Sequence, residues 1–208
     1  MALDIKEDKD LNEKFSELFK SNKRNIFLFS LIFIVIYFAI SFYLSQGEKK
    51  QLIASDLYQK VQLANELDHI EALTSELKNN FPETVYAARS SIFLGNIYFK
   101  NKDYSRAGEF YTWASKNTSE SSISSLASYQ YGIMLHVEKK NELAISVVKE
   151  IKDNGFIGLK NNLLGDIYQS AGDSTLALEH FQLAYNFYNN KNDLAKVIKL
   201  KIDAISKN

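Results

Sequence analysis

The chain has 208 residues, and its 25 lysine and arginine residues balance 25 aspartate and glutamate residues, so the formal net charge is zero. A balanced charge gives no support for nucleic acid or an acidic polymer as a partner. Cysteine is absent, which excludes disulfides, thiolate metal sites and cysteine chemistry. One proline and eight glycines are few for this length, and the composition favours an all-α fold.

Residues 1–25 are largely polar and contain one apolar stripe. Leu11, Phe15, Leu18 and Phe19 recur at i, i+4, i+7 and i+8, the spacing of one face of a short helix. Such a helix could lie on a membrane or contact a partner. It could equally lead into the next segment without a role of its own, and the residues leave both interpretations open.

Residues 26–44 read IFLFSLIFIVIYFAISFYL and carry no charge. A helix of this length spans close to the roughly 30 Å hydrocarbon core of a bilayer. Fourteen of the nineteen residues are Ile, Leu, Phe or Val, so insertion is favourable by about 4–8 kcal/mol. The run therefore predicts a single transmembrane helix in contact with lipid.

A cleaved signal peptide is the alternative for this run. Its apolar core is usually about 7–15 residues and precedes a small-x-small site. Here the core is longer and rich in Phe and Tyr, and Ser45-Gln46-Gly47 is only a weak match to such a site. An uncleaved anchor is the favoured interpretation.

Lysine and arginine counts predict the orientation of the anchor, because cytoplasmic flanks carry more of them. Six precede the run and three follow within a comparable distance: Lys6, Lys9, Lys14, Lys20, Lys23 and Arg24, then Lys49, Lys50 and Lys60. Residues 1–25 are therefore expected in the cytoplasm and residues 50–208 outside it. Lys49 and Lys50 lie at the far interface and moderate this bias.

The remaining chain is repetitive. After a degenerate helical pair expected over residues 52–82, residues 94–114 and 164–184 both begin Leu-Gly-x-Ile-Tyr. Both then place Ala twelve residues after the glycine, an aromatic residue four later and Ala three after that. A middle copy has Gly132, Leu135, Ala144, Val148 and Ile151. The predicted repeats cover about 88–121, 125–157 and 158–190.

This spacing matches the 34-residue tetratricopeptide repeat, in which each unit is a helical hairpin and hairpins stack into a solenoid. Glycine and alanine allow the two helices to approach closely, and larger residues fill the space between them. Polar turns are expected at 101–103, 138–141 and 171–173. An apolar stripe over residues 193–206 predicts a helix that caps the stack.

No catalytic motif is present, neither a nucleotide-binding glycine loop nor HExxH nor GxSxG. His69, His136 and His180 are far apart and have no second ligand at helical spacing. Asp103, Asp166 and Asp173 fall at expected turns or on helix faces, where capping or solvation explains them. The sequence therefore predicts neither an enzyme nor a metal or cofactor site.

Resemblance to the tetratricopeptide repeat family implies that the first helix of each hairpin lines a protein-binding groove. Counting from each glycine gives ten candidate residues: Arg89, Ile92, Asn96, Phe99, Tyr129, Ile133, His136, Asn162, Asp166 and Gln169. Their mixture of apolar and amide side chains suits extended polypeptide. The alternative is that each residue only faces solvent.

The whole layout also resembles the YfgM family, the ancillary subunits of the SecYEG translocon. The resemblance rests on the order of several features: the acidic start and apolar stripe, the span, Tyr86-Ala87-Ala88, KNKDYSRAGEFY from Lys100, the loop at 150–156, the unit at 165–173 and the closing Lys201-Ile202-Asp203. The aromatic character of residues 26–44 departs from the family.

This resemblance implies a bacterial inner-membrane protein with a periplasmic repeat domain. It implies SecYEG, a PpiD-type membrane-anchored periplasmic chaperone and translocating polypeptides as partners. The implied function is transfer of translocated proteins to periplasmic chaperones, with a further role in restraining an envelope stress response. The alternatives are a general envelope scaffold, in cell division or outer-membrane assembly, and a regulatory subunit of a membrane enzyme.

Overall fold

The computed structural model describes residues 22–188 and 193–207, and every regular element in this part of the chain is a helix. The all-α prediction is therefore confirmed. The apolar stripe from Leu11 to Phe19 lies outside the described residues. Contacts within the chain divide it into two units, residues 1–49 and residues 50–208.

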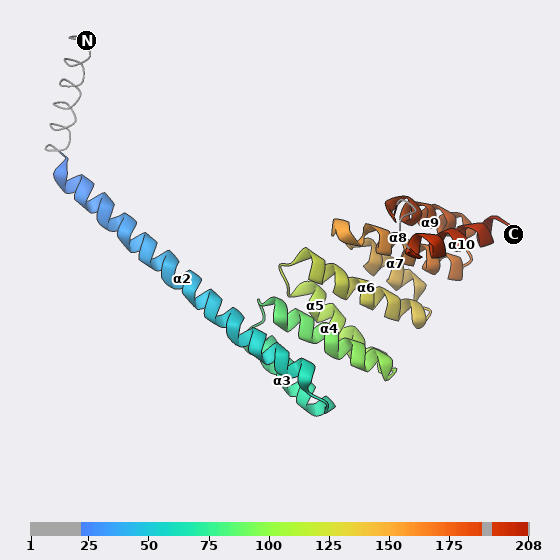
Figure 1. The fold of residues 1–208 in the computed structure, drawn as a ribbon, viewed down its shortest axis with the longest axis horizontal. Helices are drawn as coiled ribbons and strands as arrows, with labels where there is room; N and C mark the ends of the chain where they lie inside the picture. Colours follow the sequence, from blue (N-terminus) through green and yellow to red (C-terminus); the bar gives the residue numbers. More distant parts are fainter. Residues whose placement is uncertain (1–21, 189–192, 208) are drawn as a thin grey trace, which may run out of the picture. The chain divides into compact units, whose positions relative to one another are not determined.

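Helix α2 (Lys23–Leu63) contains the uncharged run (Figure 1). Among the described residues it is the one helix long and apolar enough to cross a membrane, and none of its apolar window is buried inside the protein. Residues 26–44 and 52–63, expected as separate helices, are parts of this one helix. Gly47 is the only helix-breaking residue between them. An interior glycine lowers the stability of a helix by about 1 kcal/mol, which is too little to end a helix whose other residues favour it.

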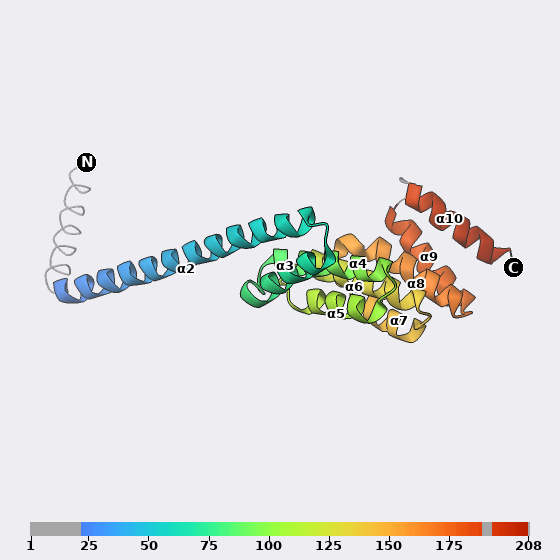
Figure 2. The same ribbon diagram turned by 90° about the horizontal axis from the view of Figure 1, so that it is seen from below.

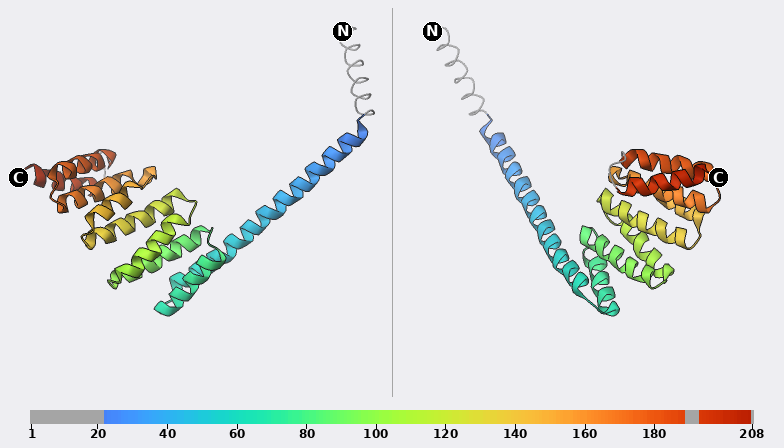
Figure 3. Two further views of the ribbon diagram at one scale, coloured as in Figure 1. Left: turned by 180° about the vertical axis from the view of Figure 1, so that it is seen from behind. Right: turned by 45° about the vertical axis from the view of Figure 1, so that its right-hand side comes forward.

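The unit 50–208 is a stack of helix pairs (Figures 1, 2 and 3). The end of α2 and α3 (Leu67–Asn80) bury apolar residues in the common core. Three hairpins follow: α4 (Val85–Lys100) with α5 (Tyr104–Lys116), α6 (Ser121–Val137) with α7 (Asn141–Lys149), and α8 (Ile157–Ser170) with α9 (Ser174–Tyr188). A 3₁₀ turn (Asn154–Phe156) precedes α8, and α10 (Asp193–Ser206) packs on α9. The predicted tetratricopeptide-like solenoid is confirmed.

The three hairpin turns share one hydrogen-bonding pattern. The second residue after each first helix has a left-handed backbone: Lys102 (φ 62°), Lys139 (φ 61°) and Gly172 (φ 85°). The next amide donates to a carbonyl five residues back, at 2.9 Å in every case. This is the Schellman motif, which satisfies the last carbonyls of a helix. Asp103 and Asp173 then cap α5 and α9 by accepting from backbone amides, 3.2 and 3.0 Å away.

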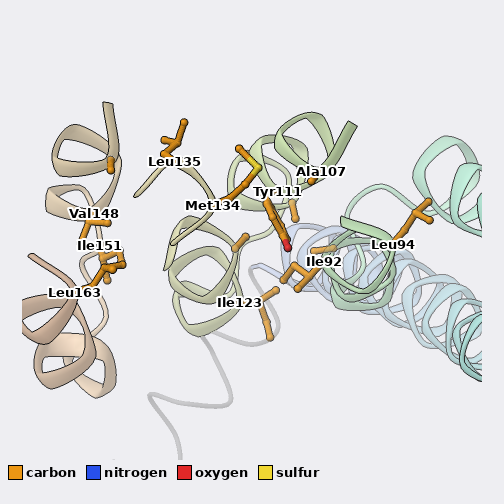
Figure 4. Packing of buried hydrophobic residues seen from close by; sticks show 14 of the residues in the cluster. Ile92, Leu94, Ala107, Tyr111, Ile123, Met134, Leu135, Val148, Ile151 and Leu163 are labelled. Atoms are coloured by element: carbon orange, nitrogen blue, oxygen red, sulfur yellow. The ribbon is translucent and has the colours of Figure 1, made fainter. Parts of the chain in front are cut away.

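Small residues set the distance between paired helices. A Cβ added at Gly95 would lie 2.8 Å from the Tyr111 ring, and one at Gly165 would lie 2.5 Å from the Phe181 ring. Tyr111 and Phe181 are fully buried. Figure 4 shows Tyr111 near Ile92 of α4 and Met134 of α6, and Val148 near Leu163 of α8. The same glycine and large side chain therefore recur because each pair closes around one interior residue.

Candidate protein-binding groove

The first helices of three successive pairs enclose a hollow of about 370 Å³, here named the groove hollow. Its walls come from α2, α4 and α6. Its lining residues are Tyr58, Arg89, Ile92, Phe93, Asn96, Ile123 and Leu126. The structure thus brings together three of the ten residues expected to line a groove, Arg89, Ile92 and Asn96.

Ile92 lies deepest of these three and is only 5% exposed, so it belongs to the floor of the hollow and to the core. Ile123 of α6 is also buried, and Phe93 and Leu126 are half-buried. Four apolar side chains therefore form a floor that can take an apolar group from a ligand.

Two polar groups of α4 remain available at the rim. Arg89 is exposed, and its guanidinium makes no hydrogen bond or ion pair with another described residue. The Tyr111 hydroxyl donates to Asn96 Oδ1 at 2.6 Å, which fixes the amide and leaves its nitrogen free to donate. Burial raises the pKa of the Tyr58 hydroxyl, and the nearby charge of Arg89 opposes this with a smaller effect. The rim therefore offers donors, which suit carbonyl or carboxylate oxygens.

The next four candidates lie elsewhere on α4 and α6. Phe99 packs against Tyr104 of α5, with ring centroids 5.8 Å apart. Tyr129 contacts the edge of Phe156 at 6.2 Å, and burial raises the pKa of its hydroxyl. Ile133 is half-buried, and His136 Nδ1 lies 3.3 Å from Oδ1 of the residue that opens α7. None of these four lines the groove hollow.

The candidates on α8 are partly covered by the last helix. The Lys201 ammonium lies 3.1 Å from Asn162 Oδ1 and 2.6 Å from Asp166 Oδ1. Gln169 is exposed. Asn162 and Asp166 are therefore held by the chain itself, whereas the groove hollow keeps open polar groups.

Residue counting missed Tyr58, Phe93, Ile123 and Leu126. Tyr58 was missed because the first helix pair has no glycine from which to count. Phe93 is one position from a candidate, and Leu126 is six residues before Gly132 just as Arg89 is six before Gly95. Applying every offset of the first repeat to Gly132 would have found Leu126, whereas Ile123 is nine residues before Gly132 and matches none of the offsets used.

A larger hollow of about 720 Å³ runs along α5 and reaches α6 and α7. Its floor includes Trp113, Tyr131 and Met134, and Leu143 lies at its edge. None of the ten candidates lines it. Lys78 of α3 lies 5.0 Å from the Trp113 ring, and burial lowers the pKa of this ammonium. This second-helix hollow is the alternative surface for a partner.

The described residues contain no group of three or more His, Cys, Asp or Glu that could hold a metal ion. His180 stacks on the Tyr168 ring, with centroids 5.3 Å apart, and its Nδ1 lies 2.9 Å from Asn161 Oδ1. These contacts explain His180 as a packing residue between α8 and α9. The chemistry that the groove hollow offers is recognition by apolar contact and hydrogen bonding.

Comparison with known proteins gives two relatives along nearly the full length. The chain is 22% identical over 209 aligned positions to the ancillary SecYEG translocon subunit of Neisseria gonorrhoeae, covering 99% of this chain and 100% of that protein. It is 25% identical to the ancillary SecYEG translocon subunit of Buchnera aphidicola subsp. Schizaphis graminum, covering 90% and 95%. The expected resemblance to this family is confirmed.

A third similarity is local. Over 94 residues the chain is 33% identical to anaphase-promoting complex subunit 3 of Schizosaccharomyces pombe, covering 45% of this chain and 14% of that protein. The family model for the tetratricopeptide repeat-like domain matches residues 17–207. This match covers well over half of the sequence, and the chain belongs to the tetratricopeptide repeat-like domain family.

Proposed function

We propose that this chain is a membrane-anchored adaptor of the SecYEG translocon that passes translocated polypeptides to periplasmic chaperones. The observation that carries the proposal is the match, over nearly the whole chain, to two proteins named ancillary SecYEG translocon subunits. The groove hollow supports it, because an open apolar floor with free donors suits a protein that binds polypeptide and does no chemistry of its own.

In the proposed topology residues 1–25 are cytoplasmic, residues 26–44 cross the inner membrane, and residues 50–208 form the periplasmic repeat domain. The support is the excess of lysine and arginine before the span. The anchor then raises the effective concentration of the repeat domain near membrane-embedded partners. These partners are SecYEG and a PpiD-type chaperone, and the hand-off between them would also restrain an envelope stress response.

In the groove hollow, an extended segment of the emerging polypeptide places one apolar side chain against Ile92, Ile123 and Leu126. Arg89 and the Asn96 amide nitrogen donate to its backbone carbonyls. Because Arg89 has no acidic partner among the described residues, segments with an aspartate or glutamate beside the apolar residue should bind best.

The test places a photo-reactive amino acid in the full-length protein in its own membranes. Leu126 samples the groove hollow, and Leu143 samples the second-helix hollow as a matched control. We expect adducts with translocating polypeptides from position 126 and few from 143. Adducts with such chains only from 143 would move the binding surface to the second helices, and adducts with cytosolic proteins would overturn the topology.

A matched pair of variants tests the polar rim. Arg89→Ala should lower the adduct yield from position 126 about tenfold, the effect of losing a charge-assisted hydrogen bond of ordinary strength. Lys100→Ala removes an exposed charge at the end of the same helix and should leave the yield unchanged. Purification in mild detergent should recover SecYEG and the chaperone with all variants. Recovery of cell-division or outer-membrane assembly proteins in their place would support the scaffold alternative.

A further inference from the structure

Residues 26–44 contain four polar side chains, and three of them lie on one face of the helix. The four are Ser30, Tyr37, Ser41 and Tyr43. Counted from Ser30, Tyr37 and Ser41 are at i+7 and i+11, so these three share one face of α2. Tyr43 is near the end of the run, at the depth where tyrosine normally occurs in membrane helices. The opposite face of the run, through Leu28, Ile32, Val35 and Ala39, is apolar until Tyr43, which follows Ala39 at i+4 near the end of the run.

Tyr37 is the unusual member of this polar face. Residue 35 is the midpoint of the run, and Tyr37 is two positions beyond it, or about 3 Å along the helix axis. Side chains of a helix lean toward its N-terminus, so the Tyr37 ring leans toward the midpoint and away from the nearer interface. Its hydroxyl is therefore placed in the hydrocarbon core, where no water is available.

The helix does not satisfy this hydroxyl itself. Ser30 Oγ donates to its own helix at Phe27 O, 3.0 Å away. The structure gives the hydroxyls of Tyr37 and Ser41 no hydrogen bond with any other described residue. Tyr37 is 69% exposed, and its ring forms an edge-on pair with the ring of the neighbouring Phe38, with centroids 5.9 Å apart. A polar group in hydrocarbon is costly without a partner, and lipid tails cannot provide one.

We infer that the face formed by Ser30, Tyr37 and Ser41 binds a transmembrane helix of another protein. That helix carries small residues opposite the Tyr37 ring and a side chain that hydrogen-bonds its hydroxyl. Contacts of this kind, with close packing at small residues and hydrogen bonds between helices, hold membrane helices together. The inference needs only that residues 26–44 cross a bilayer, and it does not depend on the groove hollow.

A second copy of this chain is a poor occupant of the same face. In a symmetric parallel pair, identical residues meet, so the two Tyr37 rings would face each other. Phe33 and Phe38 stand on either side of the face and add bulk. Tight packing of membrane helices requires small residues at the contact. Here α2 supplies the large side chain, and the small residues must come from a different helix.

The experiment uses photo-crosslinking in the full-length protein in its own membranes. Ile34 lies within the polar face and Ile32 lies on the apolar face, so the two positions are a matched pair. We expect a discrete protein adduct from position 34 and only lipid adducts from 32. The crosslinked partner peptide should come from a membrane-spanning segment with small residues and a hydrogen-bonding side chain.

Two tyrosine variants separate the hydroxyl from the rest of the helix. Tyr37→Phe, made with the crosslinker at position 34, should lower the adduct yield about threefold or more. Tyr43→Phe removes a hydroxyl at the interface and should not change it. Both variants are more apolar than the original chain and must remain in the membrane after alkaline extraction. Four results would each overturn the inference. They are equal protein adducts from positions 34 and 32, lipid adducts alone at both positions, an adduct yield that Tyr37→Phe does not change, and an adduct between two copies of this chain.

Discussion

The ammonium nitrogen of Lys201 lies 2.6 Å from Oδ1 and 2.8 Å from Oδ2 of Asp166, which ties the last helix to α8. Lys201 also donates to Asn162 Oδ1 at 3.1 Å. The side chains of Lys201 and Asp166 are 27% and 29% exposed, so water screens the pair only in part. The contact between Lys201 and Asp166 spans 35 residues of sequence, and it uses Asn162 and Asp166, two of the residues that counting predicted for a groove.

Lys201→Met should weaken the docking of α10 by about 1–2 kcal/mol, because a partly shielded charge pair and a further hydrogen bond are lost. Hydrogen exchange of the α10 amides in the full-length protein should become about tenfold faster. Lys196→Met is the control, since Lys196 pairs with Asp193 at the surface, with side chains 72% and 96% exposed. Equal acceleration by both variants would show that the Lys201 pair does not hold the helix.

Gly165→Ala should destabilise the third hairpin by about 1–3 kcal/mol, the usual cost of overpacking a core. The new Cβ would lie 2.5 Å from the Phe181 ring, which is fully buried, so the ring or the helix would have to shift. Urea unfolding of the full-length protein in detergent, followed by circular dichroism, measures the change. Gly47→Ala has nothing within 4 Å of the new Cβ, and no loss of stability is expected from it.

Lys102→Gly should stabilise the first hairpin by about 1 kcal/mol. Lys102 has φ 62°, a left-handed conformation that costs an L-residue energy and glycine little. The reciprocal change, Gly172→Lys, places a side chain at φ 85° and should destabilise the third hairpin by a similar amount. The same unfolding measurement applies. Opposite signs for the two variants are the expected result, and a loss of stability from Lys102→Gly would contradict the explanation.

His180 should make stability depend on pH. Burial lowers the pKa of its imidazole below 6.5, Glu179 opposes this, and the charges of Lys149 and Lys160 lower it further. The unfolded chain therefore binds a proton at a higher pH than the folded chain does. The contribution of His180 to stability is complete above about pH 6.5 and declines as the pH falls below that value.

The measurement for His180 is the free energy of unfolding between about pH 7.5 and about pH 5.5, above the range in which most carboxylates titrate. His180→Gln keeps a donor for Asn161 Oδ1, 2.9 Å away in the original chain, and removes the titrating group. The loss of stability toward low pH should become smaller in this variant. An unchanged or steeper dependence would show that other groups cause it.

The repeat architecture could be predicted from the sequence because its causes are local. Gly95 and Tyr111, or Gly165 and Phe181, must meet within one hairpin, and a hairpin fixes their separation along the chain. The polar turns could be predicted for the same reason, since each must reverse the chain within a few residues between the two helices of one hairpin. The continuity of α2 could not be predicted. Gly47 and the polar residues around it indicate the end of a helix, but they destabilise the helix too little to interrupt it.

The groove hollow could be predicted only in part. Counting selected Arg89, Ile92 and Asn96 on α4, and the structure shows that they line one hollow. Counting could not show that Tyr111 occupies the Asn96 oxygen, since this bond joins the two helices of a hairpin in three dimensions. Counting also could not show that Ile92 lies in the floor of the hollow and Arg89 at its rim, because the exposure of each side chain depends on how the neighbouring helix pairs pack.

The sequence by itself therefore determined the anchor, the helical class and the repeat, since periodicity and the pairing of small with large residues act over one or two turns of helix or one hairpin. The tertiary structure alone decided which candidate positions remain open. Lys201, 35 residues beyond Asp166, pairs with Asn162 and Asp166, whereas Arg89 keeps its guanidinium unpaired among the described residues. The physical reason is that burial and charge pairing depend on which distant segments pack together, and no local pattern encodes that choice.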